Sequence, residues 1–222
     1  MQDIRSREDA LFLEWKQTLG YDLFIPDGVV DPDTWERQSR KILLILKEVN
    51  STDGKQWDLR KFLHAGGRPR TWNVVVQWLA GLHRLEDDLS WAEVTQEARN
   101  DPDRTVLRTI AVMNLKKAPG TATSNMREIG DSAKKDREFL RRQFALYDPD
   151  IVITCGTHHP TWDVLHDMFV GGDWLWTKRG FRYARFTDSK TRLFAATHPE
   201  ARVPEPAKYY YLLDAVREVV NG

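Results

Sequence analysis

Glu48 and His198 are the side chains best suited to acid–base chemistry, because each follows closely on an apolar run typical of a buried strand. A carboxylate at Glu48 can activate a water molecule as a general base or stabilise a developing cation. Alternatively, it is a surface carboxylate paired with Lys47 or Lys55. His198 can donate a hydrogen bond to a developing anion on a leaving group, or it can cap the strand end through a ring nitrogen.

Other residues that carry chemistry give weaker signals. His158 and His159 are adjacent without a third ligand or carboxylate at a metal-binding spacing, so we expect no metal. Cys155 is the single cysteine, which excludes an internal disulfide and an all-cysteine metal or iron–sulfur site within one chain. At the end of IVITC, its thiol is more typical of packing than of nucleophilic catalysis. Neither GxxxxGK[ST] nor GxGxxG occurs, and we expect no cofactor.

Four apolar runs must position these side chains, and they are predicted to be strands at 41–47, 108–115, 150–156 and 192–199. The runs are continuous rather than alternating, which indicates strands buried on both faces in a mostly parallel sheet. Ligands bind beyond the carboxyl ends of such strands. Polar side chains follow all four runs, which predicts a site at this edge of the sheet: Lys47, Glu48, Asn50, Asn114, Lys116, Lys117, Thr157, His158, Thr197, His198.

Helical periodicity and helix-start residues predict the remaining elements. The expected fold is α/β, a three-layer sandwich around a central four-stranded, mostly parallel sheet. We expect one domain over residues 1–222, with N-terminal helices in 1–40 packing on its core. The predicted helices lie at 7–19, 31–39, 71–82, 125–148, 160–169 and 205–220, and a capping box predicts a further helix start at 90–94. A hairpin is predicted at 174–186, with its turn at 178–180.

Composition narrows the class of protein. With 222 residues, 41% hydrophobic and 30% charged, the chain can bury a sizeable core. No apolar run approaches the roughly 20 residues of a membrane span, and the first residues lack a signal-peptide pattern. We therefore expect a cytoplasmic protein that is a monomer and makes no membrane contact.

Charge is balanced overall but unevenly distributed. Lys plus Arg and Asp plus Glu number 33 each, which argues against nucleic-acid binding by bulk charge alone. Residues 178–192 are basic and interleaved with aromatic side chains, a mixture that suits pairing with phosphates and stacking on bases. The alternative is an ordinary solvated face. The candidate nucleic-acid-binding residues of this run are Lys178, Arg179, Arg182 and Arg185.

The order of the strand ends over about residues 41–219 resembles the uracil-DNA glycosylase superfamily. In that family the first strand ends in a motif such as GEAPG or GINPG, whose acidic or amide residue handles the attacking water. KEVNS occupies this place, with Glu48 on the acidic position. The family's N-x-x-K and proline-glycine turn are matched by MNLKKAPG, with Asn114 and Lys117 on the motif positions.

The third and fourth strands extend the resemblance. DPDIVITCG is similar to the family's strand that ends in glycine, and THPEARVPEP carries the His-Pro of its HPS motif at His198 and Pro199. Ala201–Val203 would be the loop that enters the DNA groove. Some positions depart from the pattern: Lys47 replaces a glycine, Glu200 replaces the serine, and the cysteines that hold an iron–sulfur cluster in some branches are absent.

The resemblance implies a DNA repair hydrolase that flips a damaged or deaminated base and cleaves its N-glycosidic bond. It implies that Glu48 handles the water or sugar cation and that His198 stabilises the leaving base. Substrate contacts would come from Asn114, which reads the base edge, from Trp57 or Phe62, which stack on it, and from Asn50 and Lys117. Arg202 and Val203 would probe the DNA.

Two other readings remain open. The chain is alternatively a catalytically inactive member of this superfamily that binds nucleic acid or a small base-like ligand. A nucleoside- or nucleotide-handling enzyme on a similar sheet would need only the pocket and no DNA groove. Fold alone does not decide among these functions.

Overall fold

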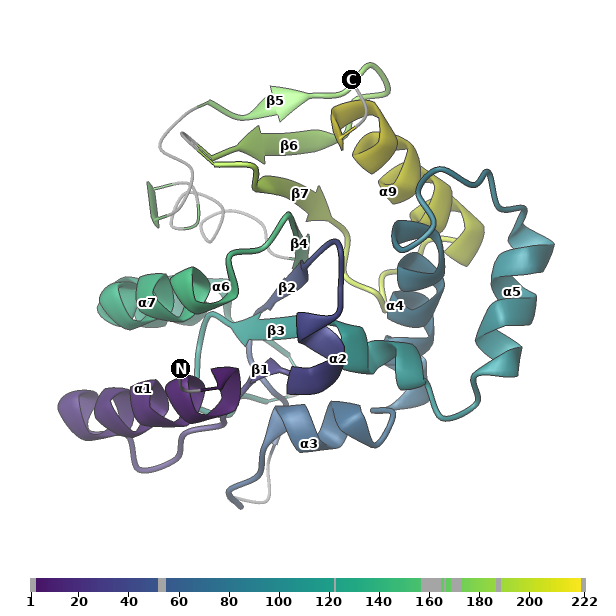
Figure 1. Cartoon of the computed structure of the whole chain (residues 1–222). Helices are drawn as coiled ribbons and strands as arrows, with labels where there is room; N and C mark the ends of the chain where they lie inside the picture. Colours follow the sequence, from purple (N-terminus) through teal and green to yellow (C-terminus); the bar gives the residue numbers. More distant parts are fainter. Residues whose placement is uncertain are drawn as a thin grey trace.

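A seven-stranded sheet forms the centre of the protein in the computed structural model, with the strand order β1-β3-β2-β4-β7-β6-β5 (Figure 1). The structure describes residues 3–51, 55–121, 123–156, 165, 167–168, 173–186 and 189–220. The strands are β1 (Gly28–Val29), β2 (Ile42–Leu46), β3 (Ala111–Asn114), β4 (Ile151–Cys155), β5 (Leu175–Trp176), β6 (Arg182–Arg185) and β7 (Arg192–Ala196).

The sheet is mixed. Its middle strands β3, β2, β4 and β7 are parallel neighbours, whereas β1 pairs with β3, β6 with β7 and β5 with β6 in antiparallel fashion. The α/β class is therefore confirmed, but the expectation of four strands was too small. Strand β1 has only two residues, too few to show a periodicity, and the predicted 174–186 hairpin joins the main sheet through β6.

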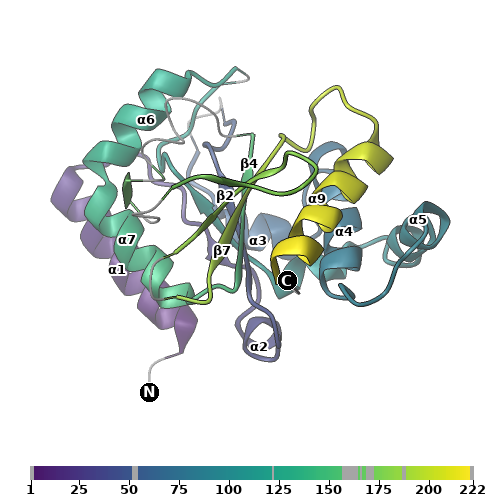
Figure 2. The ribbon, with the colours of Figure 1, turned by 90° about the horizontal axis from the view of Figure 1, so that it is seen from above.

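Helices cover both faces of the sheet (Figures 1 and 2). One face carries α1 (Ile4–Leu19), α6 (Met126–Lys135) and α7 (Arg137–Tyr147). The other carries α3 (Leu59–His64), α4 (Pro69–Leu82), α9 (Glu205–Val220) and, outside α4, α5 (Trp91–Asn100). The shorter elements are α2 (Pro32–Glu36) and a 3₁₀ helix, η1 (Thr105–Thr109). Within the ranges described, each helix is too short or too polar to cross a membrane.

Alternation along β2 explains why its sequence is apolar without interruption. Ile42 and Leu44 pack in the core under α3, α4 and α9, whereas Leu43 and Ile45 pack in the core under α1, α6 and α7. Successive strand residues point to opposite faces, so a strand covered on both sides must be apolar at every position. Burying four such side chains stabilises the fold by roughly 1.5–3 kcal/mol each.

Local signals in the sequence account for several element boundaries. Asn125 caps α6, Asp31 caps α2, and Ser90 and Glu93 form the predicted capping box of α5. The helix expected at 125–148 is instead two helices, because the chain leaves helical geometry at Asp136, whose carboxylate accepts a hydrogen bond from Tyr21 at 2.5 Å. The helix expected at 160–169 falls mostly outside the described residues.

Candidate functional site

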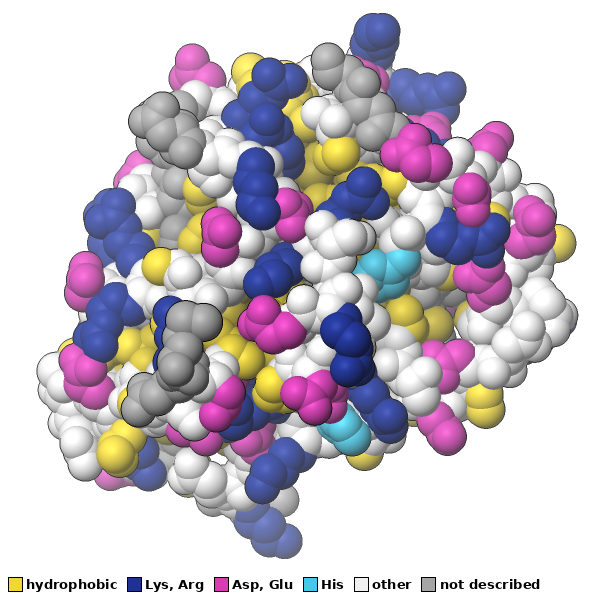
Figure 3. All heavy atoms as spheres, viewed as in Figure 1, with side chains coloured by type: hydrophobic (Ala, Val, Ile, Leu, Met, Phe, Trp, Pro, Cys, Tyr) yellow, Lys and Arg dark blue, Asp and Glu magenta, His cyan; other side chains and the backbone are white. Residues whose placement is uncertain are grey.

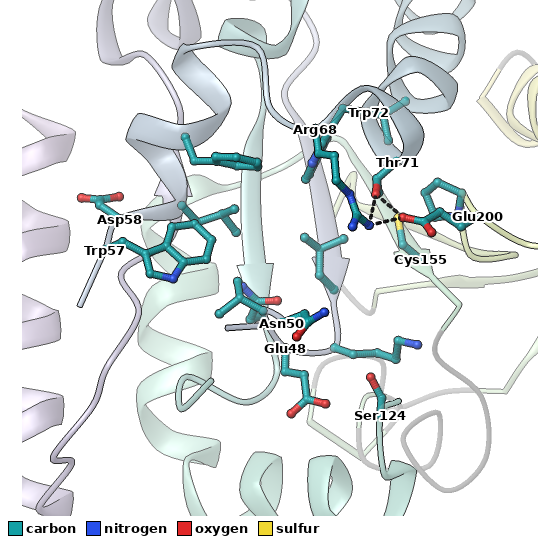
Figure 4. A pocket seen from close by; sticks show the side chains of 18 of the residues that line it. Glu48, Asn50, Trp57, Asp58, Arg68, Thr71, Trp72, Ser124, Cys155 and Glu200 are labelled. Atoms are coloured by element: carbon teal, nitrogen blue, oxygen red, sulfur yellow. Dashed lines mark hydrogen bonds and ion pairs between the residues drawn. The ribbon is translucent and has the colours of Figure 1, made fainter. Parts of the chain in front are cut away.

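A pocket of about 1120 Å³ lies at the carboxyl ends of the parallel strands. This is the edge at which sequence reasoning placed a site. The ends of β2, β3 and β4 and the loop after β7 contribute to its wall. Its lining, part of which Figure 4 shows, includes Leu46, Lys47, Glu48, Val49, Asn50, Lys55, Trp57, Asp58, Lys61, Phe62, Arg68, Thr71, Trp72, Asn114, Thr121, Ser124, Cys155, His198, Pro199 and Glu200. Every predicted catalytic and substrate-binding residue is in this set except Lys117.

One wall of the pocket forms because the chains after β2 and β3 continue side by side beyond the strands. The Lys116 N–H donates to the Lys47 carbonyl at 3.0 Å, and the Gly120 N–H donates to the Val49 carbonyl at 2.8 Å. An isolated parallel bridge then joins Asn50 to Gly120. These bonds fix the backbone that carries Glu48 and Asn50 into the pocket.

The Glu48 carboxylate is held in a buried ion pair with Lys116. Lys116 Nζ donates to Oε2 at 2.8 Å and also contacts Glu128 at 2.5 Å, while the Glu48 side chain is only 4% exposed. The partner is thus neither Lys47 nor Lys55, the two lysines considered from the sequence. Oε1 of Glu48 has no hydrogen-bond partner within the described ranges, so this oxygen can accept a hydrogen bond from a water or a ligand.

Asn114 has an unsatisfied side chain. Its backbone N–H donates to Asp27 at 2.7 Å, which fixes the strand end. Its side-chain oxygen and nitrogen are both buried and make no hydrogen bond within the described part of the chain, although the residue lines the pocket. A buried amide without partners costs several kcal/mol in folding, and such groups normally find a partner in the native state. A ligand that offers one donor and one acceptor would satisfy both atoms.

His198 lines the pocket, and the contact of its Nδ1 defines the tautomer of its ring. The backbone N–H of Glu200 donates to Nδ1 at 3.1 Å, so the neutral ring carries its proton on Nε2. Burial, and after it the positive charge of Lys47, lowers the pKa of His198. The ring is therefore a neutral donor at physiological pH. Nδ1 thus has a structural role in the loop, whereas the role of Nε2 toward a leaving group stays a prediction.

Gly156 allows His198 to come this close to β4. It adopts a positive φ of 67°, and a Cβ at this position would lie 2.5 Å from the His198 Cβ and 3.0 Å from its backbone nitrogen. Only glycine combines this backbone geometry with such a close approach. The strand-end glycine noted in the sequence therefore has a positioning role toward the histidine.

Trp57 and Phe62 provide an aromatic wall opposite the histidine loop. Their rings meet edge to face at 5.6 Å between centroids, and Phe62 is 40% exposed. Asp58, the N-cap of α3, also binds Arg60, which reaches back to Glu8 and Asp9 on α1. The N-terminal helix therefore anchors the short helix that carries Phe62.

Glu200 closes the other side of the pocket mouth. It contacts Arg68 at 2.6 Å, Arg70 at 3.1 Å and the hydroxyl of Thr71, and Figure 4 shows Arg68, Thr71 and Glu200 converging. The Thr71 hydrogen bond and the arginine charges lower the pKa of the Glu200 carboxyl. Its negative charge is thus compensated within the protein.

Cys155 lines the pocket but is buried, and burial raises the pKa of its thiol to about 12. A thiol with that pKa is protonated at neutral pH and a poor nucleophile. The expectation of a packed thiol agrees with this geometry.

Lys117 does not belong to the pocket, which corrects the substrate-binding role expected from the N-x-x-K pattern. Its ammonium is fully buried, 2.7 Å from both oxygens of Asp27 and 2.8 Å from Gln143. Neighbouring residues of an extended chain point to opposite sides, so Lys116 turns toward Glu48 while Lys117 turns into the core. Burial lowers the pKa of Lys117, and Asp27 opposes that shift.

The basic run does not reach the pocket. Arg179 is paired with Asp214, the Lys178 backbone binds Glu218, and Arg182 lies over the rings of Trp174 and Trp176. On the face of the molecule that Figure 3 shows, Lys and Arg side chains are interspersed with Asp and Glu, consistent with the zero net charge. A nucleic-acid role for Lys178, Arg179, Arg182 and Arg185 therefore stays a prediction about a second surface.

Arg202 and Val203 lie in the turn between His198 and α9. Both are exposed, and the Lys208 ammonium anchors the turn by donating to the Pro199 carbonyl at 2.6 Å. They neighbour the pocket mouth in sequence without lining the pocket.

Metal ligands are not grouped in the part of the chain that can be described: no cluster of three or more His, Cys, Asp or Glu side chains there has metal-binding geometry. The adjacent His158 and His159 lie outside the described residues.

Sequence reasoning placed Lys116 at this edge but missed its pairing with Glu48, and it did not name Arg68, Thr71 or Asp27 as site residues. Lys116, Arg68 and Thr71 act through Glu48 and Glu200, and Asp27 holds the Asn114 backbone. The alternation that separates Lys116 from Lys117 was a usable signal, whereas the pairing of Arg68 with Glu200 spans 132 residues and leaves no local trace. No protein-family model matches this sequence, and no match to a curated protein was found.

Proposed function

We propose that this chain is a hydrolase that cleaves the N-glycosidic bond of a damaged or deaminated base in DNA, with an architecture like that of the uracil-DNA glycosylase superfamily. One observation carries the proposal. The buried Asn114 amide has no partner among the described residues, and it lines the same pocket as His198 and the aromatic pair Trp57 and Phe62. An amide is well suited to read a base edge that presents a donor beside an acceptor.

The four parallel strands support the architectural part of this proposal. Strands β3, β2, β4 and β7 lie in that order between two layers of helices, and the residues after each strand meet at one edge. Two helical layers around parallel strands support an architecture like the one that the order of motifs implies, although the sheet is mixed and has seven strands.

The proposed chemistry follows from where charge develops. As the bond between the sugar carbon and the base nitrogen breaks, its electron pair leaves with the base and the sugar becomes cationic. The Glu48 carboxylate, through Oε1, orients water toward the cation and stabilises its charge. The Nε2–H of neutral His198 donates to the oxygen on which negative charge accumulates. Water then adds to the sugar carbon and gives up its proton to Oε1 of Glu48, while the released base anion takes up a proton from solvent.

Single-turnover assays test the proposal directly. The enzyme, in excess, is mixed with single- and double-stranded oligonucleotides containing uracil, hypoxanthine or xanthine, and abasic product is measured. Product from one of them supports the assignment, and no product from all of them overturns it. Glu48→Gln should then reduce the chemical rate far more than binding, because the amide cannot supply the carboxylate charge.

A second candidate, a base-binding protein without hydrolysis, is favoured by one observation. Glu48 is neutralised by Lys116 and nearly inaccessible, which is unfavourable for a general base. A thermal-shift screen with free bases separates the two functions when combined with the cleavage assay. Stabilisation by a base without cleavage of any oligonucleotide identifies the binding protein.

A separate experiment tests whether DNA binds to the surface formed by the basic run. Oligonucleotide affinity should fall with salt, and the quadruple replacement of Lys178, Arg179, Arg182 and Arg185 by Ala should flatten that dependence. An unchanged salt slope would remove these four residues from the proposed interface.

A further inference from the structure

The mouth of the pocket contains a carboxylate held by groups that ordinarily bind phosphate. Glu200 Oε1 accepts from Arg68 at 2.6 Å and from the Thr71 hydroxyl, and Oε2 lies 3.1 Å from Arg70. Arg68 is the N-cap of α4 and forms no side-chain cap bond with it. Guanidinium groups, a hydroxyl and the positive end of a fourteen-residue helix are each favourable for an oxyanion.

The charges and exposure of Arg68, Arg70 and Glu200 fit an anion-binding site that a carboxylate of the protein itself occupies. The side chains of Arg68 and Arg70 are 59% and 77% exposed, whereas that of Glu200 is 19% exposed. The carboxylate therefore sits on the inner side while the two cations remain accessible to solvent. With two arginines against one glutamate, the cluster keeps an excess positive charge.

An independent feature shows that the pocket behind this cluster is prepared for a ligand. Asn114 lines the same pocket, and its buried side-chain oxygen and nitrogen have no partner in the ranges that the structure describes. The cluster at the mouth and the amide inside therefore suit two parts of one molecule, an anionic group and a hydrogen-bonding ring.

We infer that Arg68, Arg70 and Thr71 form a phosphate subsite for a nucleotide whose base enters the pocket, and that Glu200 occupies this subsite until the phosphate displaces it. The inference rests on the proposed function for the base but not for the phosphate. Displacement requires only the Glu200 side chain to move, because its backbone N–H, which holds Nδ1 of His198, can stay in place.

Isothermal titration calorimetry at low ionic strength tests the subsite with the full chain. The ligands are inorganic phosphate, 2′-deoxyuridine, 2′-deoxyuridine 5′-monophosphate and a single-stranded thymine oligonucleotide. Glu200→Gln removes the competing charge and keeps a polar side chain, so it should tighten phosphate-containing ligands at least threefold and leave the nucleoside unchanged. Arg68→Ala in the Glu200→Gln background should reverse the gain.

Glu14→Gln is the matched control, because Glu14 is also paired with an arginine, Arg142 at 2.6 Å, but on α1 away from the pocket. It changes the net charge equally and should leave all affinities at their original values. A gain with free phosphate or mononucleotide, or a gain with the oligonucleotide alone, supports the subsite and identifies its source. Equal affinities for the original protein and Glu200→Gln, or an equal gain from Glu14→Gln, would overturn it.

The two proposals fail separately. A gain in phosphate affinity without base release in any cleavage assay would support the phosphate subsite and contradict the proposed glycosidase activity. Base release without a gain in phosphate affinity would support the glycosidase activity and contradict the phosphate subsite.

Discussion

Asn114 shows at the scale of one residue how a functional group differs from a structural one. Its amide makes no hydrogen bond within the described residues, so an apolar side chain of similar shape would lose no stabilising interaction there. We therefore predict that Asn114→Leu leaves the free energy of unfolding within about 1 kcal/mol of the original or raises it. Cleavage of the preferred substrate should fall by at least about 100-fold. Urea unfolding and single-turnover kinetics measure the two effects.

The opposite pattern would contradict this reading of Asn114. A loss of stability of about 2 kcal/mol or more with unchanged kinetics would show that the amide has a structural partner.

His198 predicts a specific dependence of stability on pH. Its pKa is lowered in the folded state from the usual value of about 6.5, so the unfolded chain binds the proton more tightly. The stability that neutral His198 contributes is complete above about pH 6.5 and is lost as the pH falls toward the folded-state pKa. Its slope is at most about 1.4 kcal/mol per pH unit.

The comparison with His198→Gln isolates this contribution. Between pH 7.5 and 5 the original protein should lose more stability than the variant, as measured by urea unfolding at each pH. His83, whose pKa burial also lowers, is present in both proteins and cancels. Parallel curves would show that His198 does not titrate as inferred.

At the scale of the element, glycines at the ends of strands and helices offer a controlled comparison. Gly156 and Gly20 have φ angles of 67° and 66°, but a Cβ at Gly20 would meet nothing within 4 Å, whereas one at Gly156 would collide with His198. We predict that Gly20→Ala costs about 1 kcal/mol of unfolding free energy from left-handed strain alone. Gly156→Ala should cost about 1–3 kcal/mol more from overpacking and should also slow cleavage.

Equal costs at the two glycines would remove the positioning role of Gly156. Chemical denaturation of both variants beside the original protein is sufficient to decide it.

Elements with strong local signals were predictable and those without were not. The apolar runs at 42–46 and 151–155 indicate buried strands, and the capping box of Ser90 and Glu93 indicates a helix start. By contrast, β1 has only two residues, which pair with β3, and the carboxylate of Asp136, where the helix breaks, binds a tyrosine 115 positions away. Such features arise from tertiary contacts, which local sequence does not encode.

At the scale of the whole molecule, the Lys117 network joins the N-terminal segment, the sheet and α7. Asp27 receives hydrogen bonds from Lys117, from Gln143 and from the backbone of Asn114. Removing one partner of a buried ion pair costs about 3–5 kcal/mol, so we predict a loss of this size for Lys117→Met. Thermal and urea unfolding measure it.

The double variant Asp27→Asn, Lys117→Met is the control for the network. It removes both charges and should recover at least about 1 kcal/mol relative to Lys117→Met. An unchanged stability in the single variant would show that Lys117 is not in the core as described.

The general position of the site was predictable because parallel strands share an edge, and that rule gathers Glu48, Asn114 and His198 from 150 residues of chain. The state of each group was not. The partner of Glu48, the tautomer of His198 and the neutralisation of Glu200 depend on which side chains from other elements arrive beside them.

Strand β1 has a consequence for how copies of this protein behave toward one another. Gly28 and Val29 occupy the outer side of β3, and the Val30 N–H donates to the Ile110 carbonyl at 3.0 Å. Without them, β3 would present unpaired N–H and C=O groups along an apolar strand, which is a template for joining two sheets edge to edge. Strand β1 thus covers part of this edge. We expect a chain that lacks β1 to aggregate more readily than the original protein.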